Sequence, residues 1–220
     1  YNMKILEDAA QGFGGEFEGV RAGAFGDIAI TSFFPSKPLG CYGDGGAVFT
    51  NDDEYAETVR SLAHHGKGSN KYDNIRIGMN RRLDTIQATI LLEKLQVLPN
   101  EITLREEVAS HYGKNLESVV ETPVIPTGYS SSWAQYTIKS PERDKIRDAL
   151  AQKEIPTMIY YSKCMHQQSA FTQSKGTYAA VSNLSRSEKL CGEVLSLPMC
   201  PYLHEKDVET VCEVIKSTLK

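Results

Sequence analysis

Lys37 is the residue of this chain whose setting points most clearly to covalent chemistry. It lies in the segment TSFFPSKPLG at residues 31–40, and the glycine-rich segment GDGG follows at residues 43–46. A lysine attacks a carbonyl carbon only as the free amine, so a reactive lysine needs a lowered pKa or a site with balanced charge. Because most lysines in loops are simply solvated, the hypothesis that Lys37 forms an imine depends on its surroundings.

Asp8 is the second residue that could take part in such chemistry. It follows the largely apolar residues 3–7. An aspartate there is often a turn or helix-capping residue, and that interpretation stays open. The functional interpretation is a salt bridge to the protonated nitrogen of a pyridine ring. A lysine that forms an imine and an aspartate that pairs with a ring nitrogen are what a pyridoxal phosphate (PLP) enzyme needs, so we expect PLP as the cofactor and Lys37 as the catalytic residue.

Five further polar residues could complete a site. Ser32, five residues before Lys37, could bind a phosphate, and Gln11 could contact the cofactor ring. Asn80 and Arg81 follow a long polar loop and could bind a phosphate or a carboxylate. Their ordinary interpretations are a serine bonded to backbone and a solvated turn. His166 lies in an irregular segment and is a candidate substrate contact, although a single histidine is more often a satisfied polar residue.

Composition excludes several other classes of function. The 220 residues are 40% hydrophobic and 24% charged, and a net charge of −4 without basic runs gives no nucleic-acid footprint. No apolar run reaches membrane-spanning length, and no signal peptide is visible. The five cysteines are scattered, so we expect reduced thiols in the cytoplasm and no metal site. The chain starts with Tyr1, which suggests the C-terminal part of a longer protein.

The periodicity of residues 1–100 predicts alternating strands and helices. Short strands are expected at residues 3–7, 26–33 and 46–50, with glycine-rich turns between them. A helix should run from about residue 51 to 64 and end at Gly66, and a polar loop should follow at residues 66–83. Asp84 should cap the next helix, which Pro99 should interrupt before a second helix begins.

The pattern after residue 100 differs. The composition changes near residues 119–132, which are rich in proline and serine. Strands are expected at 133–138 and 157–160, and helices at 144–153, 185–195 and 205–219, with an irregular stretch at 162–183. We therefore expect an α/β chain in which residues 1–100 belong to a larger domain and residues 101–220 form a smaller α+β domain.

Six motifs keep a fixed order along the chain. They are EDAAQ at 7–11, SFFPSK at 32–37, GDGGA at 43–47, HHG at 64–66, NRRLD at 80–84 and SLPM at 196–199. With these motifs the chain resembles the DegT/StrS nucleotide-sugar aminotransferases over essentially its whole length. Within that family it looks most like enzymes that aminate a 3-keto-UDP-sugar for bacterial surface polysaccharides such as O-antigen.

The resemblance implies both a fold and a set of roles. The fold would be part of a fold-type-I PLP-dependent transferase large domain, with a mixed sheet and helices, followed by a small C-terminal domain. Lys37 would hold the cofactor as an imine and later move a proton. Asp8 would pair with the pyridine nitrogen, Gln11 would contact the ring and Ser32 would bind the phosphate. Asn80 would reach the phosphate of the neighbouring subunit's cofactor, which makes a homodimer with shared active sites.

The expected reaction moves an amino group from an amino acid, by family analogy glutamate, to a ketone on a UDP-sugar. Arg81 would then be a candidate contact for a sugar carboxylate. Two alternatives stay open: the 220 residues could be a non-catalytic assembly piece, or the substrate could be a keto sugar without a nucleotide. Related sugar dehydratases carry histidine in place of the lysine, so the presence of Lys37 favours amino transfer.

Overall fold

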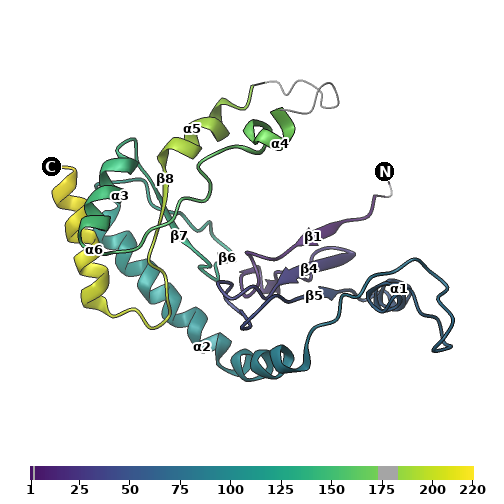
Figure 1. The fold of residues 1–220 in the computed structure, drawn as a ribbon. Helices are drawn as coiled ribbons and strands as arrows, with labels where there is room; N and C mark the ends of the chain where they lie inside the picture. Colours follow the sequence, from purple (N-terminus) through teal and green to yellow (C-terminus); the bar gives the residue numbers. More distant parts are fainter. Residues whose placement is uncertain (2, 173–182) are drawn as a thin grey trace. The chain divides into compact units, whose positions relative to one another are not determined.

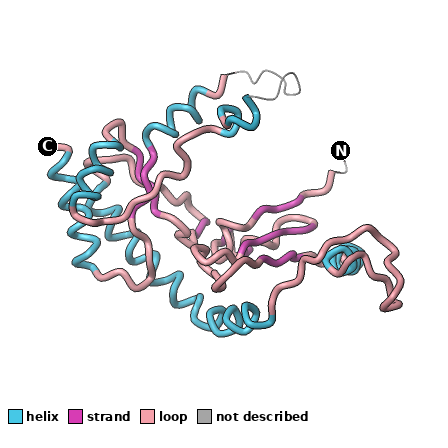
Figure 2. Tube along the Cα trace, in the orientation of Figure 1, coloured by secondary structure: helices cyan, strands magenta, loops and turns pink. Residues whose placement is uncertain are grey.

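The computed structural model describes the whole chain except residue 2 and residues 173–182 (Figure 1). The described residues form two compact units. The first unit comprises residues 1–103 and 125–134, and the second comprises residues 104–124 and 135–220. Each unit is mixed α/β (Figure 2). The assignment of residues 1–100 and 101–220 to a large and a small domain stays a prediction.

The main sheet of the first unit has three strands. They are β1 (Leu6–Asp8), β4 (Ile28–Ser32) and β5 (Gly46–Phe49). Their order is β1-β4-β5, with β1 parallel to β4 and β4 antiparallel to β5, so the sheet is mixed. The parallel pair brings the carboxyl ends of β1 and β4 to the same edge of the sheet, next to the turn that carries Lys37.

The two faces of this sheet differ in exposure. On one face Ala29 and Thr31 are buried. On the other, Leu6, Ile30 and Val48 are 64%, 37% and 43% exposed. The expectation of a buried strand at residues 3–7 was therefore wrong in its bounds and in its burial, because β1 begins at Leu6 and its apolar side chain lies on the open face.

A second small sheet was not predicted. It consists of β2 (Glu16–Phe17), β3 (Val20–Arg21) and β6 (Tyr129–Ser130), with both β3 and β6 antiparallel to β2. Strands of two residues carry no periodicity, and β6 pairs with a partner more than a hundred residues earlier in the chain. Stacking of Phe17 on Tyr129, with ring centroids 4.2 Å apart, adds to this pairing.

Helix α1 (Asp53–Ala63) forms as its sequence predicts. The Asp52 carboxylate accepts bonds from the backbone N–H groups of Glu54 and Tyr55, which satisfies two donors at the N-terminus. The chain leaves the helix through Gly66 at φ +76°, where a side chain would collide with the Arg76 carbonyl.

Helix α2 corrects one expectation. Residues 85–116 form a single helix, α2 (Thr85–Leu116), with Pro99 inside it rather than between two helices. An internal proline removes one helical hydrogen bond, at a cost of about 3 kcal/mol. On the amino-terminal side of the proline, Leu91 and Leu98 are buried, and packing of this kind stabilises a helix more than local propensity does.

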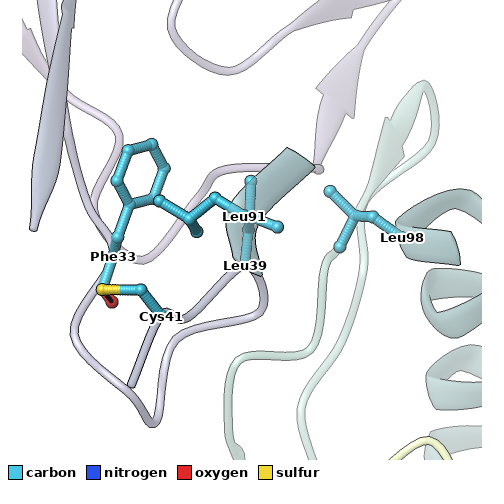
Figure 3. Packing of buried hydrophobic residues seen from close by; sticks show 5 residues of the cluster. All are labelled: Phe33, Leu39, Cys41, Leu91 and Leu98. Carbon is cyan, nitrogen blue, oxygen red and sulfur yellow. Dashed lines mark hydrogen bonds between the residues drawn. The ribbon is translucent and has the colours of Figure 1, made fainter. Parts of the chain in front are cut away.

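The core of the first unit lies beneath the segment that carries Lys37. Figure 3 shows its five buried members, Phe33, Leu39, Cys41, Leu91 and Leu98. The first three come from the segment between β4 and β5, and the two leucines come from α2. The Cys41 thiol donates to the carbonyl oxygens of Phe33 and Gly43, at 3.1 and 3.0 Å. The core therefore anchors both sides of the Lys37 turn.

The second unit contains a two-stranded antiparallel sheet and several helices. Its elements are the carboxyl-terminal part of α2, β7 (Tyr136–Lys139), α3 (Arg143–Gln152), η1 (Met165–Gln167), α4 (Ser169–Thr172), α5 (Ser185–Glu193), β8 (Val194–Leu197) and α6 (Glu205–Thr218). Its core is tightly closed: Tyr112, Ile138, Ile146, Leu150 and Ile215 are at most 1% exposed. Helices α3 and α6 match the predicted helices to within a residue or two.

Three predicted elements differ in the second unit. The strand expected at 133–138 is β7, which starts only after Trp133, a residue at φ +46°. The strand expected at 157–160 is reduced to a single bridge between Met158 and Ser196. The helix expected at 185–195 ends at Glu193, where β8 begins. Part of the stretch predicted to be irregular is helical, as η1 and α4, and its remainder includes residues outside the described part.

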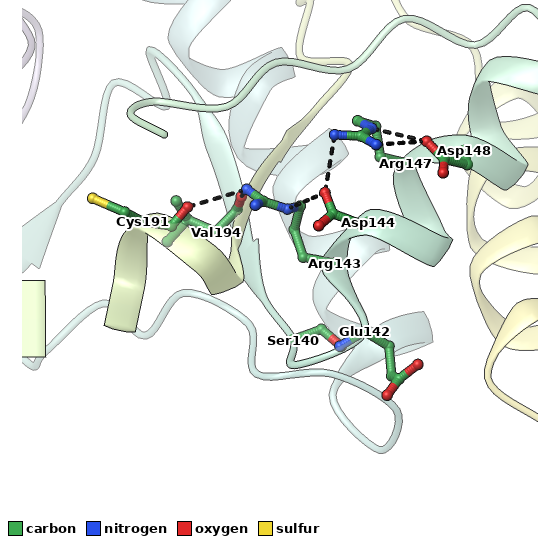
Figure 4. Close-up of polar contacts among 8 residues, drawn as sticks. All are labelled: Ser140, Glu142, Arg143, Asp144, Arg147, Asp148, Cys191 and Val194. Atoms are coloured by element: carbon green, nitrogen blue, oxygen red, sulfur yellow. Dashed lines mark hydrogen bonds and ion pairs between the residues drawn. The ribbon is translucent and has the colours of Figure 1, made fainter. Parts of the chain in front are cut away.

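Arg143 ties α3 to the junction of α5 and β8 (Figure 4). Its Nη1 donates to the carbonyl oxygens of Cys191 and Val194, at 3.3 and 3.1 Å. Its Nε lies 2.9 Å from the Asp144 carboxylate. The side chain is 9% exposed, so these contacts stabilise a buried charge. Within the described part of the chain, no helix has the length and apolar character needed to cross a bilayer.

Candidate active site

The Lys37 side chain projects from a tight turn that follows β4. The Lys37 N–H donates to the Phe34 carbonyl at 2.9 Å, and the Cys41 N–H returns to the Phe33 carbonyl at 2.8 Å. Only glycine fits at position 40, because a Cβ there would lie 2.5 Å from the Pro35 carbonyl oxygen. Lys37 is half-buried, whereas the residues that follow it are buried. The turn thus holds the lysine on a rigid base.

Helix α2 also braces this segment through two polar side chains that the sequence analysis missed. Gln87 Oε1 accepts from the Tyr42 N–H at 2.8 Å, and Lys94 Nζ donates to the Gly40 carbonyl. Both lie on the same helical stripe as Leu91 and Leu98, at intervals of three and four residues. Polar residues that interrupt an apolar stripe were the signal that could have identified these anchors.

Asp8 and Ser32 share the open face of the main sheet. Asp8 pairs with Ile30 in the parallel register, and Ser32 lies two residues beyond Ile30. Since paired residues and residues two apart point to the same face, both polar side chains lie on the face that exposes Ile30. Both also lie at the carboxyl ends of their strands, the edge at which α/β proteins commonly bind ligands.

The hydrogen bonds of Asp8 and Ser32 leave a carboxylate that can accept from a protonated ring nitrogen and a hydroxyl that can donate to a phosphate. One oxygen of the exposed Asp8 carboxylate accepts from the Ala10 N–H at 3.0 Å, which orients the group. Ser32 Oγ accepts from the Phe34 N–H at 3.2 Å, so its own hydrogen can donate to a phosphate oxygen. Lys37, Asp8 and Ser32 therefore offer the three kinds of group that suit PLP, an amine, a carboxylate and a hydroxyl, near one edge of the sheet.

Glu7, the neighbour of Asp8, has a different role. Its carboxylate accepts three bonds, from the N–H groups of Gly23, Phe25 and Gly26, at 2.6, 2.8 and 3.2 Å. Partial burial raises the pKa of Glu7, but the three backbone donors outweigh burial and the net shift is downward. Glu7 thus holds the turn at residues 23–26 against β1 and leaves Asp8 for other contacts.

Gln11 lies in the exposed turn after β1. Its backbone carbonyl accepts from Ser132 Oγ at 3.3 Å. The turn is closed by a bond from the Phe13 N–H to the Ala9 carbonyl at 2.8 Å. The structure therefore fixes the backbone of Gln11 near the carboxyl end of β1, and the predicted contact of its side chain with a cofactor ring stays a prediction.

Asn80 and Arg81 line a separate pocket of about 430 Å³. The other lining residues are Asp44, Gly45, Gly46, Arg82 and Leu83. The structure thus brings these two predicted residues to the glycine motif that follows the Lys37 turn, while Lys37 itself is not among the described residues that line the pocket. Arg82 Nε donates to Asn80 Oδ1 at 2.9 Å, and within the described part of the chain the amide N–H₂ is left to donate to an anion.

His166 belongs to the second unit, in η1. Its Nε2 lies 2.8 Å from Glu188 Oε1 on α5, and its side chain is 27% exposed. Its described contact is therefore structural, as is usual for a single histidine. A substrate contact for His166 stays a prediction.

The family follows from a match that covers nearly the whole chain. Residues 1–216 match the DegT/DnrJ/EryC1/StrS aminotransferase family model. The chain belongs to this aminotransferase family. The Lys37 turn and the open edge with Asp8 and Ser32 are thus features of a DegT/DnrJ/EryC1/StrS family member.

Two curated relatives are nucleotide-sugar aminotransferases. The chain is 42% identical over 98% of its length to the UDP-2-acetamido-2-deoxy-3-oxo-D-glucuronate aminotransferase of Pseudomonas aeruginosa. It is 37% identical over its whole length to the UDP-N-acetyl-3-dehydro-alpha-D-glucosamine 3-aminotransferase of Acidithiobacillus ferrooxidans. The chain spans 58% of the length of each of these relatives.

Solved structures of the family have the same fold. A DegT DnrJ EryC1 StrS aminotransferase from Brucella abortus is 50% identical and superposes with a TM-score of 0.93, over 98% of this chain and 57% of the other. S. venezuelae DesV, solved with a ketimine intermediate, is 33% identical with a TM-score of 0.92, over 99% of this chain and 58% of the other. The fold is therefore that of the family's PLP-dependent transferases.

Proposed function

We propose that this protein is a PLP-dependent aminotransferase that moves an amino group from an amino acid, with glutamate as the expected donor, to a ketone on a UDP-sugar. The observation that carries the proposal is the open carboxyl edge of β1 and β4, where Asp8 and Ser32 share one face beside the Lys37 turn. The 42% identity to the Pseudomonas enzyme supports the substrate class. The reaction would belong to bacterial surface polysaccharide synthesis in the cytoplasm.

When bound, PLP supplies an aldehyde carbon that accepts amines and a ring that accommodates electrons released at the neighbouring carbon. Lys37 would anchor that aldehyde through Nζ. After the substrate amine takes its place, Nζ would carry a proton between the substrate carbon that bears nitrogen and the cofactor's C4′. Because Lys37 is held on a rigid turn, its amine would act at a high effective concentration.

Asp8 and Ser32 would hold the two ends of the cofactor. The Asp8 carboxylate would accept a hydrogen bond from the protonated ring nitrogen and favour that protonation state. The Ser32 hydroxyl would donate to the phosphate, for which its free hydrogen is suited. Gln11 would contact the ring from the turn after β1. These roles use the donors and acceptors that the fold leaves available.

Asn80 and Arg81 would serve anionic groups at the neighbouring pocket. In a homodimer with shared active sites, the Asn80 amide would donate to the phosphate bound by the partner subunit, and Arg81 would bind a sugar carboxylate. The bond from Arg82 to Asn80 supports this role, since it orients the amide donor. Residues 1–100 would be the PLP-binding part and residues 101–220 a small domain, from which His166 would contact the substrate.

The test traps the cofactor and identifies the residue that holds it. The purified protein is incubated with PLP, treated with borohydride and digested, and the peptides are analysed by mass spectrometry. We expect a pyridoxyl adduct on Lys37 and none in Lys37→Ala, whereas Lys153→Ala, which removes an exposed lysine of the second unit, should keep the adduct. The same protein should convert glutamate to its keto acid when a 3-keto-UDP-sugar is present.

Two results would contradict the proposal. If neither the chain nor a longer protein that contains it forms an adduct at Lys37, the catalytic role fails and an assembly role is left. If the adduct forms but a free keto sugar is aminated as well as the UDP-linked one, the cofactor assignment stands and the nucleotide assignment fails.

A further inference from the structure

Two cysteines of the second unit lie in direct contact. The Sγ atoms of Cys164 and Cys191 are 3.3 Å apart. Cys164 precedes η1, and Cys191 lies in the last turns of α5, so the contact joins two segments that are distant in sequence. Cys164 is buried and Cys191 is half-buried. A reagent from solvent would therefore reach Cys191 first.

Polar contacts hold the two backbones on either side of the sulfur pair. Next to Cys164, His166 Nε2 lies 2.8 Å from Glu188 Oε1, so η1 and α5 are bridged a second time. Next to Cys191, Arg143 donates to the Cys191 carbonyl at 3.3 Å, as Figure 4 shows. The two thiols thus face each other across a junction that is already fixed, which lowers the entropy lost when they are linked.

We propose that Cys164 and Cys191 form an oxidation site, a dithiol that a low-molecular-weight disulfide such as oxidised glutathione converts to an intrachain disulfide. In the first step the Cys191 thiolate attacks one sulfur of the reagent, whose own S–S bond breaks and releases one thiolate. In the second step Cys164 loses its proton to solvent and attacks Cys191 Sγ, which releases the second thiolate. The two cysteines lose two electrons and two protons, and the reagent gains them as two thiols.

The chemistry of the pair fits this order of attack. The hydrogen bond with Cys191, with a smaller contribution from burial, raises the pKa of the Cys164 thiol above its ordinary value. The Cys164 thiol therefore holds its proton more tightly, which suits the second attack, made within the protein. Metal binding is a poorer explanation, because no group of three or more histidine, cysteine or acidic side chains among the described residues is placed to hold a metal ion.

Among the described residues, the other three cysteines have no second thiol in contact. Cys41 lies in the core of the first unit and donates to two backbone carbonyls. Cys212 is 1% exposed inside the core of the second unit. Cys200 is exposed and therefore serves as the matched control for a thiol that reacts without a partner.

The test uses the purified, PLP-treated protein with all five cysteines. After incubation with oxidised glutathione and alkylation of the remaining thiols, digestion should yield one peptide pair linked through Cys164 and Cys191. Dithiothreitol should release it. Because the disulfide joins residues 27 positions apart, it should raise the Tm of the second unit by about 10 °C or more.

Single variants make the result interpretable. Cys200→Ser should keep the linked pair, and Cys191→Ser should remove it. Cys164→Ser should leave a stable glutathione adduct on Cys191, because the second attack is lost; a far-UV circular dichroism spectrum like that of the wild type checks that the variant is folded. A wild-type protein that stops at glutathione adducts, or that links either cysteine to Cys200, would overturn the proposal. None of these readouts depends on aminotransferase activity.

Discussion

One face of the main sheet of the first unit is exposed. In the sheet of the second unit, by contrast, most residues are buried. In β1, β4 and β5 the exposed large hydrophobic residues are Leu6, Ile30 and Val48, and Asp8 is exposed as well. In β7 and β8, by contrast, Ile138 and Leu195 are at most 1% exposed. The predicted reactive residues Asp8 and Ser32 belong to the open face, so chemistry and core packing are carried by different regions of the chain.

Because of this difference, mutations in the two regions should change different properties of the protein. Side chains on the open face have few neighbours whose packing depends on them, so their replacement should change reactivity far more than stability. Side chains in the closed core of the second unit should do the opposite, because a deletion there leaves a cavity. The following predictions test that separation, from the largest effect to the smallest.

The largest effect is expected for Lys37→Ala. Turnover should fall by about 10³-fold or more, since the residue proposed to move the proton is removed. The free energy of unfolding should change little, because Lys37 is half-buried on a turn held by backbone bonds. Steady-state kinetics and urea unfolding of the same preparations measure the two effects. A variant that unfolds easily, or one that keeps its turnover, would break the comparison.

Leu150→Ala should act on stability instead. Leu150 is fully buried in α3, and its truncation should lower the free energy of unfolding by about 2–5 kcal/mol. The matched control is Leu190→Ala on α5, where the leucine is 41% exposed and a change within about 0.5 kcal/mol is expected. Denaturant unfolding followed by circular dichroism distinguishes the two. Equal losses in both variants would show that the second unit is not packed as described.

High pH should destabilise the second unit. Burial raises the pKa of Tyr136 from 10.0 to about 12 and that of Cys212 from 9.0 to about 11. Since the fold binds these protons more tightly than the unfolded chain, their contribution is fully present below pH 9 and is lost as the pH rises towards 12. Urea midpoints measured between pH 8 and pH 11 test this, and Tyr136→Phe should weaken the dependence. A midpoint that does not change over this range would contradict it.

In the first unit we expect a smaller loss of stability, and at low pH instead of high pH. The pKa of Glu7 is lowered from 4.5, so its contribution is present above pH 4.5 and is lost as the pH falls through the folded value. Glu7→Gln should cost about 1–3 kcal/mol at neutral pH, because it removes charge-assisted bonds to three N–H groups. Glu16→Gln, which affects only a surface pair with Arg21, is the control. Equal effects of the two variants, measured by urea unfolding, would refute the structural role of Glu7.

The sequence predicted elements whose signals are local. The helices expected at residues 51–64 and 205–219 correspond to α1 and α6 to within about two residues. It failed where the signal is not local. The pairing of β6 with β2 depends on chain segments far apart, and Pro99 remains inside α2 although local propensity opposes a proline there.

The candidate site likewise contains residues that the sequence predicted and residues that it missed. The sequence predicted that Asp8 follows one strand and that Ser32 and Lys37 lie at the end of another, and the structure pairs these strands in parallel, although the roles of the three residues stay predictions. The anchors Gln87 and Lys94 were missed, since only the packed helix shows what they bond. The contact of Cys164 with Cys191 was equally invisible, because no spacing rule relates two cysteines separated by 27 positions.

The contrast between the adjacent acids at the end of β1 has an electrical consequence. Successive side chains of a strand point to opposite faces, so the carboxylates of Glu7 and Asp8 face away from each other. Amide dipoles surround the charge of Glu7 and shield it. A cation that approaches the open face therefore meets the field of Asp8 with little competition from its neighbour, even though the two acids are joined by a single peptide bond.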